Sequence, residues 1–365
     1  MRVAALLMTG FPGFLGSALL PRLLARREGV RAVCLVQDRH SETARRRLAE
    51  IEREHPHTHG RVVLLTGDIT APDLGLAPAE LKALDDVQEV WHLAAVYDLT
   101  VPKSVARRVN VDGTAQVLEF CQSRPRLHRL QYVSTCYVSG LYDGEFTEES
   151  LDEGQTFRNH YESTKFEAEL LVRKAMADGL PATIYRPGIV VGDSRTGETQ
   201  KYDGPYFLAT FLRRQSRVAL VPAVGPADRV RVCVVPRDFV VQAMDLLSVM
   251  DASVGRTFAL TDPHPPTARQ VVNTFAQHLG KTVFWVPLPL GATRRLVDTV
   301  PGLERLLGLP AEGLDYFASP TTYATTNTDA LLSGTGLSCP PFESYAGRLL
   351  DYMVAHPEIH SDAMT

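Results

Sequence analysis

The sequence has few cysteines, and they are scattered. Its 365 residues include five, and no two of them stand in CxxC spacing: Cys34, Cys121, Cys136, Cys233 and Cys339. This odd and dispersed set argues against a disulfide framework or a zinc site. Hydrophobic residues make up 45% and charged residues 22%, which is the balance of an ordinary globular protein. A chain of this length can build a full core without a metal or a disulfide.

Excess positive charge and long apolar runs are also absent. The formal net charge is −4 and the pI is near 6.3, so no general basic field exists to hold nucleic acid. Residues 45–47 are three arginines, interpreted as one solvated helix face. No segment approaches the roughly 18 uninterrupted apolar residues of a spanning helix. Residues 3–8 are apolar but run straight into a turn, which favours a buried strand over a signal peptide. A cytoplasmic protein with no transmembrane segment is therefore expected.

Short apolar runs alternate with longer amphipathic ones in the first half of the chain. Strand-like runs are expected at 3–8, 32–36, 62–65, 90–93, 130–133 and 182–185. Helix-like runs are expected between them at 14–27, 41–54, 79–84, 102–122 and 158–177. Such alternation is typical of repeated βαβ units, so the sequence predicts an α/β fold with a Rossmann-type doubly wound parallel sheet.

The pattern loosens after Gly188, where glycine and proline become frequent. We expect residues 1–190 to form a dinucleotide-binding domain that carries the catalytic residues, and 191–365 to form mainly a substrate-binding lobe. A strand at 230–235, a helix at 238–250, a strand at 257–260 and a helix at 268–279 indicate that residues 230–285 partly return to the main sheet. The smaller lobe is therefore expected to be discontinuous, with short helices after residue 287.

Three glycines stand between the first strand and the first helix. They are Gly10, Gly13 and Gly16, and Phe14 and Leu15 open the helix within the same turn. Glycine allows a tight turn and close approach of the backbone to a pyrophosphate, and the helix N-terminus supplies free N–H groups. This strand–turn–helix context predicts a phosphate-binding turn for a dinucleotide.

The end of the second strand should decide which dinucleotide is bound. An acid there binds the ribose hydroxyls of NAD, whereas a basic residue pairs with the extra phosphate of NADP. The sequence offers neutral Gln37 followed by Asp38 and Arg39, so either NADP or NAD remains open. After the third strand, Asp68 and the adjacent Ile69 are candidates for the adenine end, and Asp68 has the alternative of capping its own turn.

A tyrosine and a lysine four residues apart lie early in the helix expected at 158–177. Tyr161 and Lys165 share one face at this spacing. A phenol has a pKa near 10 and exchanges protons poorly at neutral pH unless a nearby cation lowers that value. Lys165 is such a cation and can also reach the nicotinamide ribose. The pair therefore predicts a proton donor tuned by an ammonium group.

Two hydroxyls and one amide complete the predicted catalytic set. Ser134 and Thr135 end the strand at 130–133, and one of them can hydrogen-bond the substrate oxygen, with Thr135 preferred and Ser134 in reserve. Asn110 interrupts a helical run where propensity favours Leu or Ala. It either holds a water in a proton relay to Lys165 or braces the backbone.

Seven motifs in this order resemble the extended short-chain dehydrogenase/reductase superfamily over roughly residues 3–285. They are Thr9-Gly10-x-x-Gly13-x-x-Gly16, Gly67-Asp68, His92-Leu93-Ala94-Ala95, Asn110-Val111-x-Gly113-Thr114, Tyr132-Val133-Ser134-Thr135, Tyr161-x-x-x-Lys165 and Tyr185-Arg186-Pro187-Gly188. Within the superfamily, residues 94–99 and 188–197 are most similar to the fatty acyl-CoA reductase and thioester-reductase branch.

The resemblance implies further cofactor contacts. Leu93, Ala94 and Ala95 would line the cofactor, and Pro187, Gly188 and Ile189 would lie along the nicotinamide. One departure concerns Gln37, because members that use NADP often carry arginine there. Another is length, since many bacterial acyl-CoA reductases of this type have a further domain.

The expected function is transfer of hydride from NADPH or NADH to a carbonyl, with Tyr161 protonating the oxygen. An acyl thioester or a long-chain aldehyde is the first choice of substrate, and a ring ketone or other secondary-metabolite carbonyl is the alternative. A nucleotide-sugar epimerase or dehydratase shares the fold, but a dehydratase needs an acid pair where Cys136 and Tyr137 stand. A non-catalytic dinucleotide sensor would not need Tyr161 and Lys165. Residues 202–207, with Phe211 and Leu212, form either an apolar substrate wall or core, and the protein is expected to be a monomer or homodimer.

Overall fold

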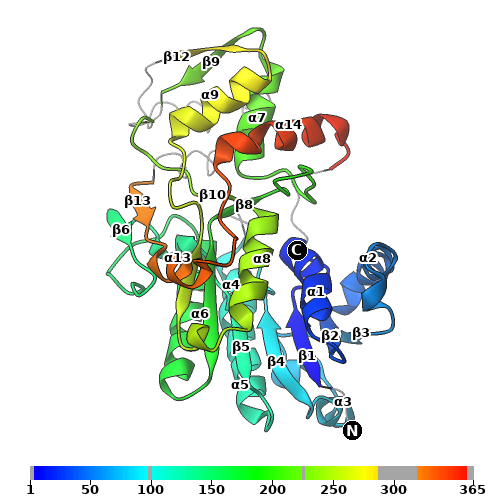
Figure 1. Ribbon diagram of the computed structural model, residues 1–365. Coiled ribbons are helices and arrows are strands. Elements are labelled where there is room, and N and C mark those ends of the chain that lie inside the picture. Colours follow the sequence, from blue (N-terminus) through cyan, green and yellow to red (C-terminus); the bar gives the residue numbers. More distant parts are fainter. Residues whose placement is uncertain (1–3, 98–100, 224–226, 287–318, 360–365) are drawn as a thin grey trace.

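In the computed structural model, residues 4–97, 101–223, 227–286 and 319–359 are described. A seven-stranded parallel sheet forms the larger part (Figure 1). Its strands, in spatial order, are β3 (Val62–Thr66), β2 (Arg31–Val36), β1 (Ala5–Thr9), β4 (Val87–His92), β5 (Arg129–Val133), β7 (Ala182–Pro187) and β11 (Thr257–Leu260). The chain builds outward from β1 in one direction and then crosses to β4 on its other side. The predicted fold class, a doubly wound parallel sheet, is confirmed.

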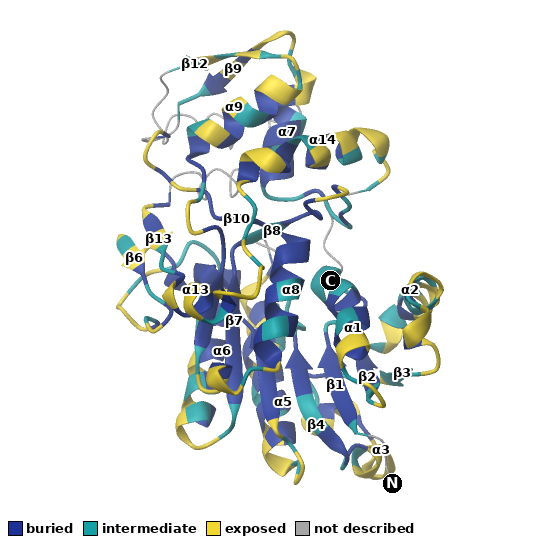
Figure 2. Ribbon diagram, viewed as in Figure 1, coloured by how far each residue is buried: buried dark blue, intermediate teal, exposed yellow. Residues whose placement is uncertain are grey.

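The central strands are buried on both faces, and their side chains alternate between two cores. In β1, Leu6 and Met8 pack into one core while Ala5 and Leu7 pack into the other. Helices α1 (Phe14–Arg26), α2 (Ser41–Glu54) and α8 (Arg237–Ser248) cover the first face. Helices α5 (Gly113–Ser123) and α6 (His160–Ala177) cover the second. Figure 2 shows the central strands largely dark blue between these layers, as expected for a parallel sheet.

The helix expected at residues 102–122 is three elements rather than one. It consists of α4 (Lys103–Arg107), a π-helical turn (Arg108–Asp112) and α5. The π turn contains Asn110, whose side-chain amide bonds the backbone of Val96 instead of facing solvent. A single wide turn of this kind often marks a functional site. Helix α3 (Pro78–Ala83) is the short helix expected at 79–84.

A second, smaller body lies beyond the carboxyl ends of the strands (Figure 1). It contains α7 (Pro205–Arg214), α9 (Ala268–His278) and α14 (Ala346–Ala355), with two-stranded sheets β9 (Val218–Pro222) with β12 (Thr282–Val286) and β8 (Ile189–Val191) with β10 (Val234–Pro236). The strand expected at 230–235 is thus shorter and pairs with β8 outside the main sheet, because β7 is already paired on both sides by β5 and β11. The segment predicted at 257–260 is β11 and does pair with β7.

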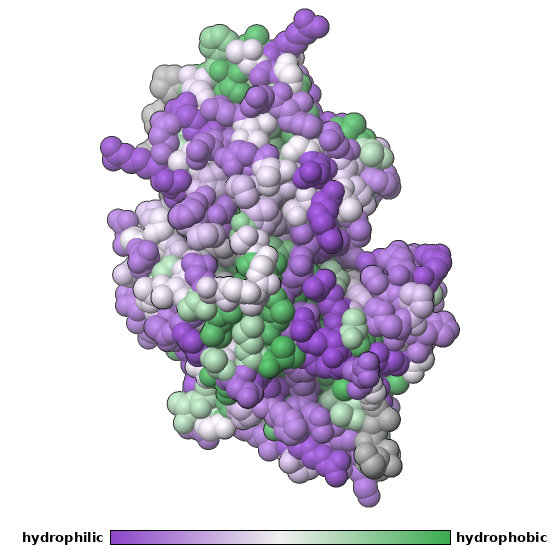
Figure 3. Space-filling view, in the orientation of Figure 1, coloured by the Kyte–Doolittle hydropathy of each residue, from purple (hydrophilic) through white to green (hydrophobic). Residues whose placement is uncertain are grey.

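The β9–β12 pair has one covered face and one open face. Ala219, Val221 and Trp285 face the lobe core, whereas Val218, Leu220 and Phe284 are exposed. Figure 3 shows hydrophobic surface at the top of the molecule, over these strands. In the described part of the chain, no helix has both the length and the apolar character needed to cross a membrane.

The C-terminal segment returns to the main body. Strand β13 (Thr321–Tyr323) pairs in parallel with β6 (Gly144–Phe146), and α13 (Thr326–Leu332) packs beside β11. Glu148 accepts hydrogen bonds from the backbone of Ala259, at 2.9 Å, and from the backbone and hydroxyl of Thr328. One buried carboxylate therefore joins three segments. The helices expected after residue 287 fall partly at 287–318, outside the described residues.

Candidate active site

The glycine turn is closed too tightly for side chains. Gly10 has a φ of 86°, and a Cβ there would lie 2.8 Å from the backbone nitrogen of Ala94. A Cβ on Gly13 or Gly16 would lie 2.7 or 2.6 Å from the carbonyl oxygen of Gly10. Helix α1 follows with no side-chain cap at its start, so its first N–H groups remain free for a ligand. The turn therefore has the shape of a pyrophosphate cradle.

This turn lies at the point where the direction of strand order reverses. The segment after β4, with Leu93, Ala94 and Ala95, is partly exposed and adjoins Gly10. Ligands of open parallel sheets bind at such a switch point. On the helix side, Phe14 lies under the guanidinium of Arg237 at 5.0 Å, and Leu15 is partly buried. Residues 98 and 99 of the predicted branch motif are outside the described residues.

At the end of β2, the side chain of Gln37 hydrogen-bonds both Arg39 and Asp68, two of the residues expected to meet the cofactor. Its side-chain oxygen accepts two hydrogen bonds from Arg39, at 3.0 and 2.8 Å, and Gln37 also hydrogen-bonds Asp68. Asp38 and Arg39 are exposed. Asp68 accepts from the backbone of Thr70 at 2.9 Å, which is the turn-capping alternative. Desolvation would raise the pKa of Asp68, but its hydrogen bonds and nearby positive charge hold that pKa below its ordinary value.

Several predicted cofactor contacts are buried, among them Ile69 and Gly188. Ile69 is buried, and a Cβ on Gly113 would lie 3.0 Å from its side chain. Gly188 is buried after β7, where a Cβ would lie 2.3 Å from the carbonyl oxygen of Cys233. Pro187 is buried beside it, and Ile189 is partly exposed. Close packing against the backbone of Cys233 therefore requires glycine at 188, independently of any cofactor contact.

The structure brings Tyr161, Thr135 and Lys165 together at the carboxyl ends of β5 and β7. Tyr161 hydrogen-bonds Thr135, and the ring of Tyr97 lies edge-on to Tyr161 at 4.9 Å. Burial raises the pKa of the Tyr161 phenol, and the Thr135 hydrogen bond only partly offsets this. Burial lowers the pKa of Lys165 to about 7, against a smaller opposing effect of Glu169. The phenol therefore keeps its proton near neutral pH.

Ser134 and Thr135 are adjacent but serve different partners. Ser134 donates to the buried carboxylate of Glu169 at 2.6 Å. Thr135 contacts Tyr161 and accepts the backbone N–H of Tyr137 at 3.2 Å. The reserve candidate of the sequence analysis thus points into a structural network, and the preferred one points to the phenol.

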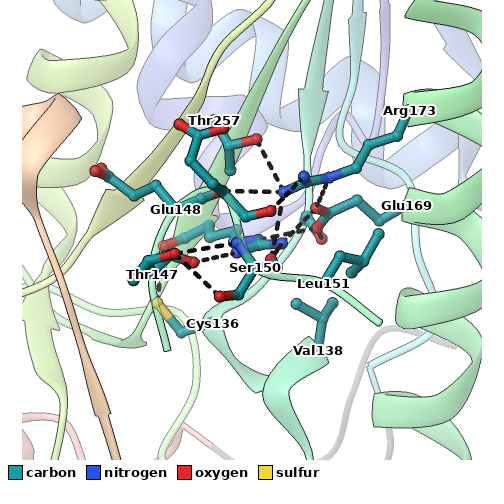
Figure 4. A network of polar contacts seen from close by, with 12 residues as sticks. Cys136, Val138, Thr147, Glu148, Ser150, Leu151, Glu169, Arg173 and Thr257 are labelled. Carbon is teal, nitrogen blue, oxygen red and sulfur yellow. Dashed lines mark hydrogen bonds and ion pairs between the residues drawn. The ribbon is translucent and has the colours of Figure 1, made fainter. Parts of the chain in front are cut away.

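That network is buried and highly connected (Figure 4). Glu169 accepts from Arg186 at 2.6 and 3.1 Å and from Arg173 at 3.0 Å. The two arginines continue to backbone carbonyls of the loop at 147–150. Desolvation would raise the pKa of Glu169, but the arginines and Ser134 hold that pKa below its ordinary range. Glu169 is not among the residues predicted from the sequence, although its spacing of four residues from Lys165 is a signal for it.

The side chain of Asn110 braces the backbone at Val96. Its side-chain oxygen accepts from the backbone of Val96 at 2.8 Å, and its amide donates to the Val96 carbonyl and to Thr164. These bonds hold the segment before Tyr97. The backbone carbonyl of Asn110 accepts from the hydroxyl of Thr114 at 2.6 Å, which ties the π turn to α5.

Most aromatic residues of the predicted segment at 202–212 belong to the lobe core rather than to a substrate wall. Tyr202, Tyr206, Phe211 and Leu212 are buried in the lobe core. The hydroxyl of Tyr206 accepts the backbone N–H of Gly192 at 3.1 Å. Across the described ranges, no group of three or more His, Cys, Asp or Glu side chains is arranged to hold a metal ion.

Comparison with known proteins agrees with this geometry. Residues 8–244 match the NAD-binding family described as male sterility protein. A non-canonical nonribosomal peptide synthetase, cpsA of Aspergillus campestris, is 30% identical over 69% of the chain and 25% of its own length. Aldehyde reductase lnaA of Aspergillus flavus is 26% identical over 92% of the chain and 34% of its own length. The chain thus spans about a quarter to a third of these curated relatives.

A solved structure is similar over nearly the whole chain. The terminal R domain of the myxalamid PKS-NRPS pathway has a TM-score of 0.83 at 28% identity, covering 98% of this chain and 92% of that one. A dTDP-glucose 4,6-dehydratase from Bacillus anthracis in complex with NAD has a TM-score of 0.67 at 18% identity, which shows the shared fold alone.

Proposed function

The chain belongs to the male sterility protein family of NAD(P)-binding reductases of the extended short-chain dehydrogenase type, and from that premise we propose that it reduces the carbonyl of an apolar acyl thioester or aldehyde. The observation that carries the proposal is the hydrogen bond between Tyr161 and Thr135 at the carboxyl ends of β5 and β7. Relatives named as peptide synthetases, aldehyde reductase and fatty acyl-CoA reductase support this substrate class.

The residues fit a nicotinamide dinucleotide. Gly10, Gly13 and Gly16 would cradle its pyrophosphate, because a side chain at any of them would fill the turn. Gln37 and Arg39 would meet the adenosine ribose, with both NADP and NAD accepted. When bound, the cofactor supplies the hydride that reaches the carbonyl carbon.

The chain's own residues handle the oxygen. The phenol of Tyr161 gives its proton to the carbonyl oxygen, and Thr135 hydrogen-bonds that oxygen as negative charge develops on it. The ammonium of Lys165 stabilises the resulting phenolate, since an adjacent cation favours the charged form. Ser134 supports the strand end through Glu169 and takes no proton. Reduction of an aldehyde in this way gives an alcohol, and reduction of a thioester releases the thiol and gives an aldehyde.

The test is consumption of NADPH and NADH, followed by absorbance, with panels of acyl thioesters, aldehydes and cyclic ketones. We expect turnover with thioesters or aldehydes, and products identified by mass spectrometry. Turnover of cyclic ketones alone would replace the proposed substrate class with the ring-ketone alternative. No oxidation of either cofactor with any panel would contradict the reductase proposal.

A further inference from the structure

The ammonium of Lys165 is held by two groups of β5. Its Nζ donates to the hydroxyl of Tyr132 at 3.0 Å and to the carbonyl oxygen of Val133 at 2.8 Å. Lys165 and Tyr132 are both buried. An ammonium has three N–H groups, so these bonds use two of them. Among the described residues the third has no hydrogen-bond partner, and it is the one left for a ligand.

The protons of the neighbouring side chains can be assigned one by one. The hydroxyl of Thr114 donates to the carbonyl of Asn110, so its oxygen accepts from its other neighbours. These are Nε2 of His92, at 3.0 Å, and the phenol of Tyr132. Tyr132 therefore uses its single hydrogen on Thr114 and presents its lone pairs to Lys165. The hydrogen bond to Thr114 therefore fixes the orientation of the Tyr132 hydroxyl.

The chain of hydrogen bonds continues to the glycine turn. With its proton on Nε2, His92 accepts at Nδ1 from the hydroxyl of Thr9 at 2.8 Å. The oxygen of Thr9 in turn accepts the backbone N–H of Ala94 at 3.1 Å. The ammonium is thus connected through buried side chains to the strand end that precedes Gly10.

We propose that Tyr132 is a positioning residue for the reduction: its phenol oxygen holds the ammonium of Lys165 at the end of β5, one helical turn from Tyr161. This inference rests on the proposed function, in which Lys165 assists Tyr161. Val133 contributes its backbone carbonyl, which any residue at position 133 would also have. Tyr132 is the contact that depends on residue type.

Three titratable groups face Lys165, and a fourth faces its partner Tyr132. Glu169 comes from its own helix, Tyr132 from β5 and His92 from β4, while Tyr161 acts on the phenol of Tyr132. Burial, with the Lys165 charge, lowers the pKa of His92 to about 3, so its ring is neutral. Burial raises the pKa of Tyr132 well above its ordinary value, so its phenol is neutral too. Glu169 is negative but is shared by two arginines and Ser134. A neutral acceptor in direct contact therefore helps Lys165 remain an ammonium.

The test compares Tyr132→Phe with Tyr185→Phe. Both substitutions remove one buried hydroxyl from the sheet; that of Tyr185 donates to Gln131 at 2.8 Å, away from Lys165. The readout is the pH titration of the Lys165 side-chain ¹⁵N signal, assigned with Lys165→Arg. We expect Tyr132→Phe to lower its midpoint by about one pH unit or more, the size expected from a lost hydrogen bond to a charged group. The alkaline limb of kcat/KM should move the same way, and Tyr185→Phe should move neither.

The outcomes separate this inference from the proposed function. An equal titration midpoint in both tyrosine variants would overturn the inference even if the enzyme reduces thioesters. A lowered midpoint in a protein that reduces none of the carbonyl panels would support the role of Tyr132 and contradict the proposed function. If Tyr132→Phe does not fold, Thr114→Val takes its place, because it frees the phenol to rotate. Thr114→Val should lower the midpoint by less than Tyr132→Phe. Thr114→Ser keeps the hydroxyl and should leave the midpoint near the wild-type value. An unchanged midpoint in Thr114→Val would then overturn the inference.

Discussion

At the carboxyl edge of the main sheet the buried side chains are charged and hydrogen-bonded, whereas in the lobe around α7, α9 and α14 they are apolar. Glu169, Arg186 and Lys165 are all nearly inaccessible at the edge. The lobe core is built mainly from apolar residues such as Phe275 and Leu349, with a few tyrosines whose hydroxyls bond the backbone.

Because of this difference, the two regions should tolerate amino-acid substitutions to different extents. A buried charge needs every partner in place, so losing one partner of the network is costly. An apolar core accepts other hydrophobic side chains if its volume is kept. In the proposed function, the chemistry therefore depends on the charged network at the carboxyl edge, whereas the lobe core can be repacked without disturbing that network.

The sharpest test of the edge is Tyr161→Phe. The substitution keeps the ring packed against Tyr97 and removes only the proton donor. We expect kcat to fall by about 10²–10⁴-fold, the usual contribution of general acid catalysis. Cofactor affinity, measured by calorimetry, should stay nearly unchanged. A loss of kcat below tenfold would contradict the assignment of Tyr161.

The largest effect on folding is expected from Glu169→Ala. It leaves the buried Arg186 and the partly buried Arg173 without their carboxylate, and breaking a buried pair typically costs about 3–5 kcal/mol in the free energy of unfolding. Urea denaturation measures the change. The matched control is Glu42→Ala, whose pair with Arg45 is exposed and should contribute little. Similar midpoints for the two variants would show that the buried network does not support the edge.

Cofactor choice tests the outer end of the same edge. Gln37→Arg should favour NADPH over NADH by about 1.5–3 kcal/mol, because the new guanidinium can hydrogen-bond the 2′-phosphate. The measurement is the ratio of kcat/KM for the two cofactors. We expect weak discrimination in the wild type, where Arg39 and Asp38 are both exposed. An unchanged ratio in the variant would show that position 37 does not meet the ribose.

The pH dependence of cofactor use should follow Lys165. Burial lowers its pKa to about 7, so it is an ammonium below that pH and loses its proton as the pH rises above it. The neutral amine neither donates to the ribose as strongly nor stabilises a phenolate. We therefore expect kcat/KM for the cofactor to fall toward tenfold per pH unit above about 7. Lys165→Ala should remove this dependence and reduce both cofactor binding and turnover; a profile that it leaves unchanged would assign the dependence to another group.

The smallest effect is expected on the open face of the lobe. Leu220→Ser changes an exposed side chain of β9 and should alter the free energy of unfolding by no more than about 0.5 kcal/mol. Thermal unfolding and the Tyr161-dependent activity should both stay near wild type. A large loss of stability would show that the open face is buried in the folded protein.

The strand and helix pattern of the first half could be predicted because local periodicity determines it. The expected helix at 41–54 and strand at 257–260 have the bounds of α2 and β11. The π turn could not be predicted, since it depends on Asn110 reaching Val96 across a loop. Nor could the pairing of β10 with β8, because strand partners are chosen by the sheet positions already filled.

The site shows the same division. The spacing of Tyr161 and Lys165 is visible in the sequence because both lie on one helix. The choice between Ser134 and Thr135 was not, since it depends on Glu169, which lies 35 residues further along the chain. Tyr132 belongs to one of the sequence motifs, but its contact with Lys165 requires a distant helix to pack on its strand.

The pairing of β6 with β13 also has a consequence for how the protein is made. Gly144 can pair with Thr321 only after Thr321 has been synthesised. In the same way, Glu148 can accept the hydrogen bond of Thr328 only after Thr328 has been synthesised. Domains emerging from the ribosome tend to fold from the N-terminus, and contacts between distant residues form late. The pairing of β6 with β13 therefore forms late. A nascent chain can therefore have a finished glycine turn well before the β6–β13 pairing is in place.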